Sequence, residues 1–215
     1  MLHIQRFVCN MIQENCYVVS DETREAVIID CGAFYDSEKE AIREYIEQNE
    51  LKPVHLIATH GHFDHNFGNM FVNDTWGLKV EVHADDEELI KSLPMQAATI
   101  CGVQMADDSF PPAGRYFRGE DSISFGNHRF TILETPGHTP GGVFFYCKEE
   151  QVAFSGDTLF RGSIGRSDLP GGSMFSLIQS LRMIAQLPDD TRVYPGHGES
   201  TTIGAEVAGN PYMDR

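Results

Sequence analysis

One short segment near residue 60 constrains this chain more than any other. The sequence THGHFDH, residues 59–65, contains three of the nine histidines of the chain and an aspartate within a few positions. It overlaps the run PVHLIATH, which has the apolar character of a strand buried on both faces. The fold must therefore bring a core strand to the edge of a polar, histidine-rich site.

The spacing within this segment predicts two neighbouring metal positions. In an extended chain, side chains two positions apart point to the same side, so His60 and His62 should address one point, with Gly61 leaving space between them. Asp64 and His65 stand where the next helix is expected to begin, in DHNFGNMFVNDTW, so they should turn toward a second point. Imidazole and carboxylate suit zinc and similar divalent ions, and the lack of a cysteine in the segment disfavours a closed structural zinc site. We expect an open, catalytic site.

Three later segments each place a metal-binding side chain after a strand-like run, within glycine-rich sequence. They carry His138 in ETPGHTPGG, Asp157 in FSGDTLF and His197 in YPGHGES. Strands that end at one rim can hold such residues on loops. A lone histidine of this kind is more often a residue of a turn or core. Together with residues 59–65, the three predict one composite site.

The first half of the chain predicts strands, a helix and further strands. LHIQRFVC, NCYVVSD and EAVIIDCG should form a small antiparallel sheet. Ser37 and Glu40 have capping-box spacing before a helix whose apolar stripe ends ahead of Pro53. VEVHADD predicts a strand that leads into an acidic helix start, and residues 94–114, with prolines and no clean period, predict a long surface connection.

The second half repeats this order. Two strand pairs are expected, with turns at Gly126-Asn127 and at residues 148–151. A helical stripe follows with Ser173 as its N-cap, and then the short strand RVYPG. Strands followed by a helix, twice over, predict an α/β fold in which two sheets pack face to face with helices outside. We expect residues 1–215 to form a single domain.

Composition excludes several classes of function. The chain has 215 residues and a net charge of −16, which repels phosphate backbones and anionic lipid surfaces, so nucleic acid is an unexpected partner. No apolar stretch approaches the ~20 residues of a membrane helix, and the N-terminus lacks the pattern of a signal peptide. We therefore expect a cytoplasmic protein without a membrane partner. The five scattered cysteines indicate reduced thiols, to which we assign no functional role.

These motifs together resemble the metallo-β-lactamase superfamily. THGHFDH matches its T-H-x-H-x-D-H motif, and GHTPG, SGDTLF and PGHG follow in that superfamily's order and spacing. The chain is most similar to the short bacterial glyoxalase II-like (hydroxyacylglutathione hydrolase-like) group, through GDTLF.G.IGR.D.PGG and PGHG..TTIG.E...NPY. The resemblance covers nearly the whole chain. It implies a four-layer αββα sandwich of two mixed sheets with two bound metal ions.

The resemblance also implies a ligand set and a reaction. Two metals about 3.5 to 4 Å apart would lower the pKa of a shared water from ~15.7 toward ~7 and so supply hydroxide to attack a thioester of the S-lactoylglutathione kind. Zinc is the first expectation for the metal, and iron and manganese suit the same ligands. Asp64 and Asp157 are the residues expected to act in catalysis. The implied ligands are His60, His62 and His138 for the first metal, Asp64, His65 and His197 for the second, and Asp157 as a bridge between them.

The sequence departs from full-length glyoxalase II at two places that concern the substrate. Those enzymes continue beyond the equivalent of Tyr212 into a helical domain that holds glutathione, whereas this sequence ends at Arg215, so weak binding of glutathione is expected. Their Lys-x-Tyr substrate contact is replaced by Arg166-Ser167-Asp168. Arg166 could hold a substrate carboxylate, or it could pair with Asp168 on the surface.

Other functions use the same ligands. A persulfide dioxygenase has a similar fold and a single iron, whose two histidines and one carboxylate match His60, His138 and Asp157. A β-lactamase is disfavoured by the missing export signal and a tRNA-processing nuclease by the charge, while a lactone or other ester hydrolase stays open. A module that merely binds metal would leave the open coordination positions without a use. The sequence makes no prediction of oligomeric state.

One residue outside the motifs has a candidate role. Asp30 ends the strand AVIID near the expected rim and could accept a hydrogen bond from a ligand histidine. The alternative is a turn or cap residue.

Overall fold

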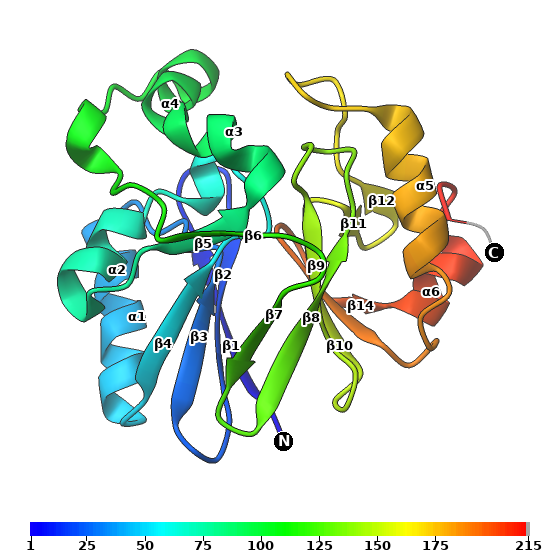
Figure 1. The fold of residues 1–215 in the computed structure, drawn as a ribbon, viewed down its shortest axis with the longest axis horizontal. Helices are drawn as coiled ribbons and strands as arrows, with labels where there is room; N and C mark the ends of the chain where they lie inside the picture. The colour runs from blue at the N-terminus through cyan, green and yellow to red at the C-terminus, as the bar shows by residue number, and fades with distance from the viewer. Residues whose placement is uncertain (214–215) are drawn as a thin grey trace.

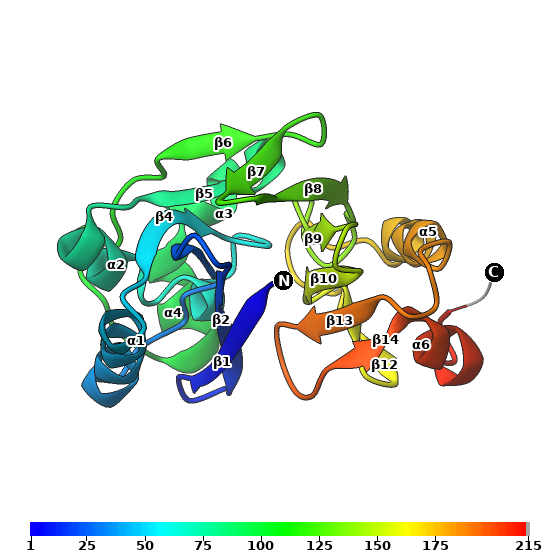
Figure 2. The ribbon, with the colours of Figure 1, turned by 90° about the horizontal axis from the view of Figure 1, so that it is seen from below.

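Two six-stranded sheets packed face to face form the centre of the molecule, as described for residues 1–213 by a computed structural model (Figure 1). Successive side chains of a strand point to opposite faces of its sheet. One face of each sheet therefore contributes to a shared apolar core, which contains Val19 and Ile29 from the first sheet and Phe130 and Phe154 from the second. The opposite faces are covered by helices, which makes the predicted four-layer αββα sandwich (Figure 2).

The first sheet has the strand order β1-β2-β3-β4-β5-β6. Strands β1 to β3 are antiparallel, as predicted, and β3 to β6 are parallel. Apolar side chains of α1, α2 and α4 pack on its outer face. The elements of this half are β1 (His3–Cys9), β2 (Glu14–Ser20), β3 (Glu25–Ile29), α1 (Asp36–Gln48), β4 (Lys52–Ile57), η1 (Phe63–His65), α2 (Asn69–Trp76), β5 (Val80–His83), η2 (Ala84–Asp86), α3 (Glu87–Lys91), α4 (Leu93–Cys101), η3 (Asp107–Ser109) and β6 (Arg115–Phe117).

The second sheet has the strand order β14-β13-β10-β9-β8-β7, with α5 and α6 on its outer face. Its strands are antiparallel except for β13, which lies parallel to β10. No helix within residues 1–213 combines the length and apolar character needed to cross a membrane. The elements of this half are β7 (Ser122–Phe125), β8 (His128–Glu134), β9 (Val143–Cys147), β10 (Val152–Gly156), β11 (Leu159–Phe160), β12 (Ser163–Ile164), α5 (Met174–Ile184), β13 (Arg192–Pro195), β14 (Thr201–Thr202) and α6 (Ile203–Gly209).

The predicted elements of the second half are confirmed. The turn at Gly126-Asn127 joins β7 to β8, and Gly126 has a φ of +50° there. The Ser173 hydroxyl caps α5 by accepting a hydrogen bond from the Ser176 amide, at 3.2 Å. The short elements β11, β12, β14 and α6 were not predicted.

The predicted capping box of the first helix is wrong by two residues. Helix α1 begins at Asp36, and the Glu38 carboxylate accepts hydrogen bonds from the backbone amides of Phe34 and Tyr35, at 2.8 and 3.0 Å. The box is therefore built around the N-cap Tyr35, because Glu38, in the third helical position, reaches back to the backbone amides just before the helix.

The predicted surface connection over residues 94–114 contains a helix instead. Helix α4 begins at Leu93, with Pro94 in its first turn, where a missing N–H breaks no helical hydrogen bond. Leu93 and Ala97 are buried, and Gly102 ends the helix with a φ of +67°. Its single buried face was too short to give a clear period in the sequence.

Two expectations around the histidine motif also change. Strand β4 is fully buried only at Leu56 and Ile57, and its earlier residues are partly or fully exposed. The next α-helix begins at Asn69, so Asp64 and His65 lie on the single 3₁₀ turn η1 rather than in the first turn of a helix.

Candidate metal site

Loops that follow four core strands bring all seven predicted ligands to one place. Residues 60–65 follow β4, His138 follows β8, Asp157 follows β10 and His197 follows β13. Their ligand atoms form overlapping groups in which every atom lies within 4.8 Å of the others. We call these residues the seven-residue cluster; it comprises a first trio (His60, His62, His138), a second trio (Asp64, His65, His197) and Asp157.

The first trio points three imidazole nitrogens at one position. His62 Nδ1 lies 2.9 Å from His138 Nε2. His138 Nδ1 lies 2.7 Å from the Arg166 carbonyl oxygen and donates to it, which leaves Nε2 as the lone-pair nitrogen. His60 Nε2 is buried and has no hydrogen-bond partner among residues 1–213. A cation at this position would satisfy all three nitrogens.

The spacing of the first trio depends on Gly61. A Cβ at this position would lie 2.7 Å from the Leu89 Cβ, closer than packed carbon atoms approach. Gly61 thus lets the chain between the two histidines pass close to α3. This close approach is a second reason for a glycine here, besides the space between His60 and His62 that the sequence predicted.

The second trio combines two imidazoles with a carboxylate. Asp64 Oδ2 lies 3.4 Å from His65 Nε2 and 3.2 Å from His197 Nε2. The Nδ1 atom of each histidine faces an acceptor, Asp30 Oδ2 at 3.1 Å for His65 and the Gln13 carbonyl at 3.2 Å for His197. Both rings therefore present Nε2 to the cluster.

Asp157 lies between the two trios. Its carboxylate oxygens are 3.3 Å from His65 Nε2, 3.5 Å from His138 Nε2 and 3.7 Å from His197 Nε2. One carboxylate in contact with both trios is the arrangement that a bridging ligand requires.

Burial and charge favour the metal-binding protonation states of His60, His62 and Asp157. Burial lowers the pKa of His60 well below its usual value, and burial is also the main reason that the pKa of His62 falls to about 4. Burial acts to raise the pKa of Asp157, but the surrounding histidines, His65 foremost, hold it well below its usual range. Neutral imidazoles and an ionised carboxylate are the forms that bind divalent ions. For His65 and His197, burial acts to lower the pKa, but the surrounding carboxylates raise it above the usual value.

Asp30 has the supporting role that was one of its two predicted possibilities. Its carboxylate accepts hydrogen bonds from His65 Nδ1 and from the amide and hydroxyl of Thr59, at 3.1, 2.6 and 2.7 Å. Its φ of +52° places it in the left-handed region that aspartate tolerates better than most residues. Asp30 thus orients His65 and ties the histidine loop to the end of β3.

Asp86 is a buried residue of the site that sequence analysis missed. Its carboxylate accepts hydrogen bonds from the Gly61 amide at 2.8 Å, the Thr139 hydroxyl at 2.8 Å and the Gly141 amide at 2.6 Å. It joins the loop of His60 and His62 to the loop of His138. In the sequence Asp86 lies in HADD, at the acidic start of an expected helix. Carboxylates are favoured at helix starts, so nothing in the sequence marked this one as part of the site.

Glu14 and Asn10 also lie behind the cluster and were missed. The Glu14 side chain is fully buried, and neither carboxylate oxygen has a hydrogen-bond partner in the described part of the chain. Burial raises the pKa of Glu14 well above its usual value. Asn10 Nδ2 donates to the backbone oxygens of Asp64 and Gly32, at 2.9 and 3.0 Å, and so holds η1 in place.

Arg166 contributes to the site through its backbone. Its carbonyl accepts the His138 hydrogen bond, while its exposed guanidinium forms a two-point ion pair with Asp168, at 2.7 and 2.8 Å. This pairing is one of the two roles considered from sequence. A contact between the guanidinium and substrate stays a prediction.

The comparison with known proteins agrees with this geometry. A family profile described as the metallo-beta-lactamase superfamily matches residues 10–197. The chain therefore belongs to the metallo-β-lactamase superfamily, and the fold and the two groups of donors define it as a metallo-hydrolase of that superfamily.

Individual relatives cover nearly the whole chain. It is 37% identical over 216 residues to hydroxyacylglutathione hydrolase GloC of Haemophilus influenzae, covering 99% of each protein. The crystal structure of BLEG-1 B3 metallo-beta-lactamase is similar with a TM-score of 0.89 and 36% identity, over 98% of this chain and 99% of that one. The crystal structure of TTHA1623 in a di-iron-bound form has a TM-score of 0.85 and 36% identity, over 97% of this chain and all (100%) of that one.

Proposed function

We propose that this protein is a metal-dependent hydrolase that cleaves a small acyl thioester of the S-lactoylglutathione kind. The observation that carries the proposal is the position of Asp157 between two complete trios of metal-binding atoms. The similarity to a hydroxyacylglutathione hydrolase over the full length of both chains supports thioesters as the substrate class.

The residues of the cluster fit this chemistry. Two bound metal ions would activate a water at neutral pH and polarise the carbonyl of the thioester. Asp157 fixes the separation of the two positions, Asp30 orients His65, and the Arg166 carbonyl orients His138. No serine or cysteine nucleophile is needed.

We propose zinc as the metal, with iron as the alternative. Histidine and carboxylate ligands serve both ions, and TTHA1623, 36% identical to this chain, was crystallised in a di-iron-bound form. A single-iron persulfide dioxygenase would use His60, His138 and Asp157. The second trio, with His65 fully buried against Asp64 and Asp157, favours two metals instead.

The partner we propose is thus a small molecule. The net charge of −16 argues against nucleic acid and anionic membranes, and we propose a cytoplasmic location on the sequence grounds given above.

The proposal is tested by metal analysis and four parallel assays on the purified protein. We expect two metal ions per chain and hydrolysis of S-lactoylglutathione that a chelator abolishes and added metal restores. A β-lactam, a lactone and oxygen uptake with glutathione persulfide are the comparison assays. One iron per chain with oxygen uptake would contradict the proposal in favour of a dioxygenase. A kcat/KM for the β-lactam or the lactone above that for every thioester would contradict it too.

A further inference from the structure

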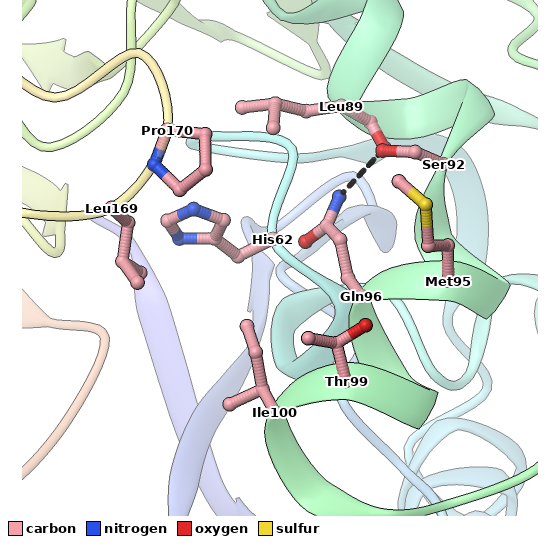
Figure 3. A pocket seen from close by; sticks show the side chains of 9 residues that line it. All are labelled: His62, Leu89, Ser92, Met95, Gln96, Thr99, Ile100, Leu169 and Pro170. Carbon is pink, nitrogen blue, oxygen red and sulfur yellow. Dashed lines mark hydrogen bonds between the residues drawn. The ribbon is translucent and has the colours of Figure 1, made fainter.

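A cavity of about 380 Å³ opens beside the first trio, with His62 in its wall (Figure 3). Helices α3 and α4 supply one side through Leu89, Met95 and Ile100, and the loop after β12 supplies the other through Leu169 and Pro170. Its volume is at the small end of the about 300 to 1,000 Å³ typical of ligand pockets. Part of this wall comes from the segment that the sequence suggested was a surface connection.

Part of the apolar wall is exposed to solvent. The residue exposures of Met95 and Ile100 are 66% and 49%, so both leave carbon atoms in water. Exposed apolar side chains that gather around a concave surface indicate a binding site more often than scattered ones do. Burial of this surface by a ligand would be favourable.

The polar atoms of the wall are largely used within the protein. Gln96 Nε2 donates to the carbonyls of Gly61 and Leu89, at 3.2 and 2.7 Å, and Gln96 Oε1 accepts from the Phe63 amide at 3.3 Å. Ser92 Oγ donates to the Leu89 carbonyl at 3.0 Å. Gln96 therefore ties α4 to the loop that carries His60 and His62, and fixes the cavity against the cluster.

The wall offers no positive charge to an anionic ligand. Among the residues that line the cavity in the described part of the chain there is no lysine or arginine, and the one histidine, His62, directs Nδ1 at the first trio. The Arg166 guanidinium nearby in sequence is paired with Asp168. The carboxylates of a glutathione moiety would find no cationic side chain in this wall, where the Thr99 hydroxyl is a donor without a hydrogen-bond partner among residues 1–213, and would lose hydration.

We propose that this cavity binds the acyl chain of the substrate, and that the preferred substrates are thioesters of apolar acyl groups of about six carbons. This inference rests on the thioester hydrolase proposed above and names its substrate class. A chain of this length fits, since about 380 Å³ lies within the range of about 300 to 1,000 Å³ of pockets that bind small ligands. The polar lactoyl group would gain little from such a wall.

The first test is a series of thioesters with one neutral thiol, N-acetylcysteamine, carrying lactoyl, acetyl, butanoyl and hexanoyl groups. A fully buried methylene raises kcat/KM about fourfold, so we expect hexanoyl to exceed acetyl by at least about thirtyfold, allowing for incomplete burial. A second series keeps the acetyl group and lengthens an alkyl thiol. We expect little dependence on thiol length.

Matched variants test the location of the site. Met95→Glu and Ile100→Glu place a charge in the wall, and we expect each to lower the hexanoyl-to-acetyl ratio of kcat/KM at least about tenfold, because the acyl chain would then desolvate that charge. Met183→Glu, at a half-exposed methionine of α5 outside the cavity, is the control and should keep the ratio. Circular dichroism and the melting temperature of each variant check that it folds.

A binding measurement separates this inference from the proposed function. The thioether S-hexyl-N-acetylcysteamine cannot be hydrolysed, and calorimetry should show it binding the unmodified protein with a negative heat-capacity change, and binding Met95→Glu at least about tenfold more weakly. Hydrolysis of thioesters without any dependence on acyl length, or with dependence on thiol length alone, would overturn the inference and leave the proposed function standing. Absence of all thioester hydrolysis, with thioether binding retained, would overturn the proposed function and with it the acyl assignment.

Discussion

At the scale of single residues, Asp157 has the strongest predicted effect because its carboxylate contacts both trios. Asp157→Ala would remove a ligand from both metal positions at once, whereas replacement of any histidine removes one ligand from one position. We expect kcat to fall at least about 1,000-fold, or ~4 kcal/mol, and further than in any other single ligand variant. Metal content and turnover are measured together. Retention of two metals with near-normal turnover would contradict the assignment.

Asp30 allows a finer test of how a ligand is oriented. Asp30→Asn keeps the size of the side chain, and asparagine tolerates the φ of +52° at this position, so the backbone should be unchanged. The amide is a poorer acceptor for His65 Nδ1 and Thr59. We expect metal affinity to fall about 10- to 100-fold, measured by competition with a chelator. If Asp30→Asn leaves the affinity unchanged while Asp64→Asn lowers it, the orienting role is wrong.

At the scale of elements, the two histidine loops depend on Asp86, which joins them through three hydrogen bonds. In Asp86→Asn the new NH₂ group cannot accept from the Gly61 or Gly141 amide, so at least one of these bonds is lost. We expect a loss of about 10- to 100-fold in metal affinity. The neighbouring Asp85→Asn is the control, since the Asp85 side chain is 55% exposed. Equal affinities in the two variants would show that Asp86 does not position the loops.

A pH-dependent contact joins the end of β2 in the first sheet to the start of β8 and the β9–β10 turn in the second. His128 Nδ1 and Nε2 face Asp21 and Glu150, at 2.8 and 3.0 Å, and only the imidazolium donates to both. Burial acts to lower the pKa of His128, but its hydrogen bonds to the two carboxylates raise it above the ordinary value of 6.5. The contact therefore contributes its full stability below pH 6.5 and loses it as pH rises through the raised pKa.

This contact gives a stability prediction. His128→Gln should lower the melting temperature by about 2 to 4 °C at pH 6, the effect of roughly 1 kcal/mol in a chain of this size, since a partly exposed pair is worth no more. The difference from the unmodified protein should shrink by pH 9. His3→Gln, at an exposed histidine of β1, is the control. A difference that grows with pH would contradict the assigned charge on His128.

The elements that sequence predicted correctly have patterns that are complete within a few residues. The turn at Gly126-Asn127 and the Ser173 cap each depend on residue types at fixed local positions. Helix α4 was missed because its core contact consists mainly of Leu93 and Ala97, too few to set a period, and because Pro94 reads as a break until its place in the first turn is known.

The residues of the candidate site also divide into those that a local sequence pattern predicts and those that only the folded chain brings into contact. The proximity of the seven candidate ligands could be predicted because four lie in one motif and each of the others lies beside glycine after a strand. Asp86 and Gln96 could not, since each acts through contacts with residues 25 to 55 positions away that only the folded chain creates. The cavity is absent from the sequence pattern for the same reason, as α3, α4 and the loop at Leu169 meet only in space.

At the scale of the whole molecule, charge should govern which thioesters bind. The chain carries 32 acidic and 16 basic side chains, a net charge of −16, so its field repels an anionic substrate before any contact forms. S-lactoylglutathione carries two carboxylates and one ammonium group and is a net anion, whereas an N-acetylcysteamine thioester is neutral. The two substrates therefore separate long-range repulsion from the chemistry of the cluster.

Salt provides the measurement. The Debye length shortens from about 30 Å at 0.01 M to about 3 Å at 1 M, so added sodium chloride should screen the repulsion. We expect KM for S-lactoylglutathione to fall about threefold between 0.02 and 0.5 M salt, with kcat unchanged because the field acts on encounter rather than on bond cleavage. KM for the neutral acetyl thioester should stay within about 1.5-fold and controls for salt effects on the enzyme itself. A KM for S-lactoylglutathione that rises with salt would instead reveal a local cationic contact to the glutathione carboxylates, with Arg166 released from Asp168 as the first residue to test by Arg166→Gln.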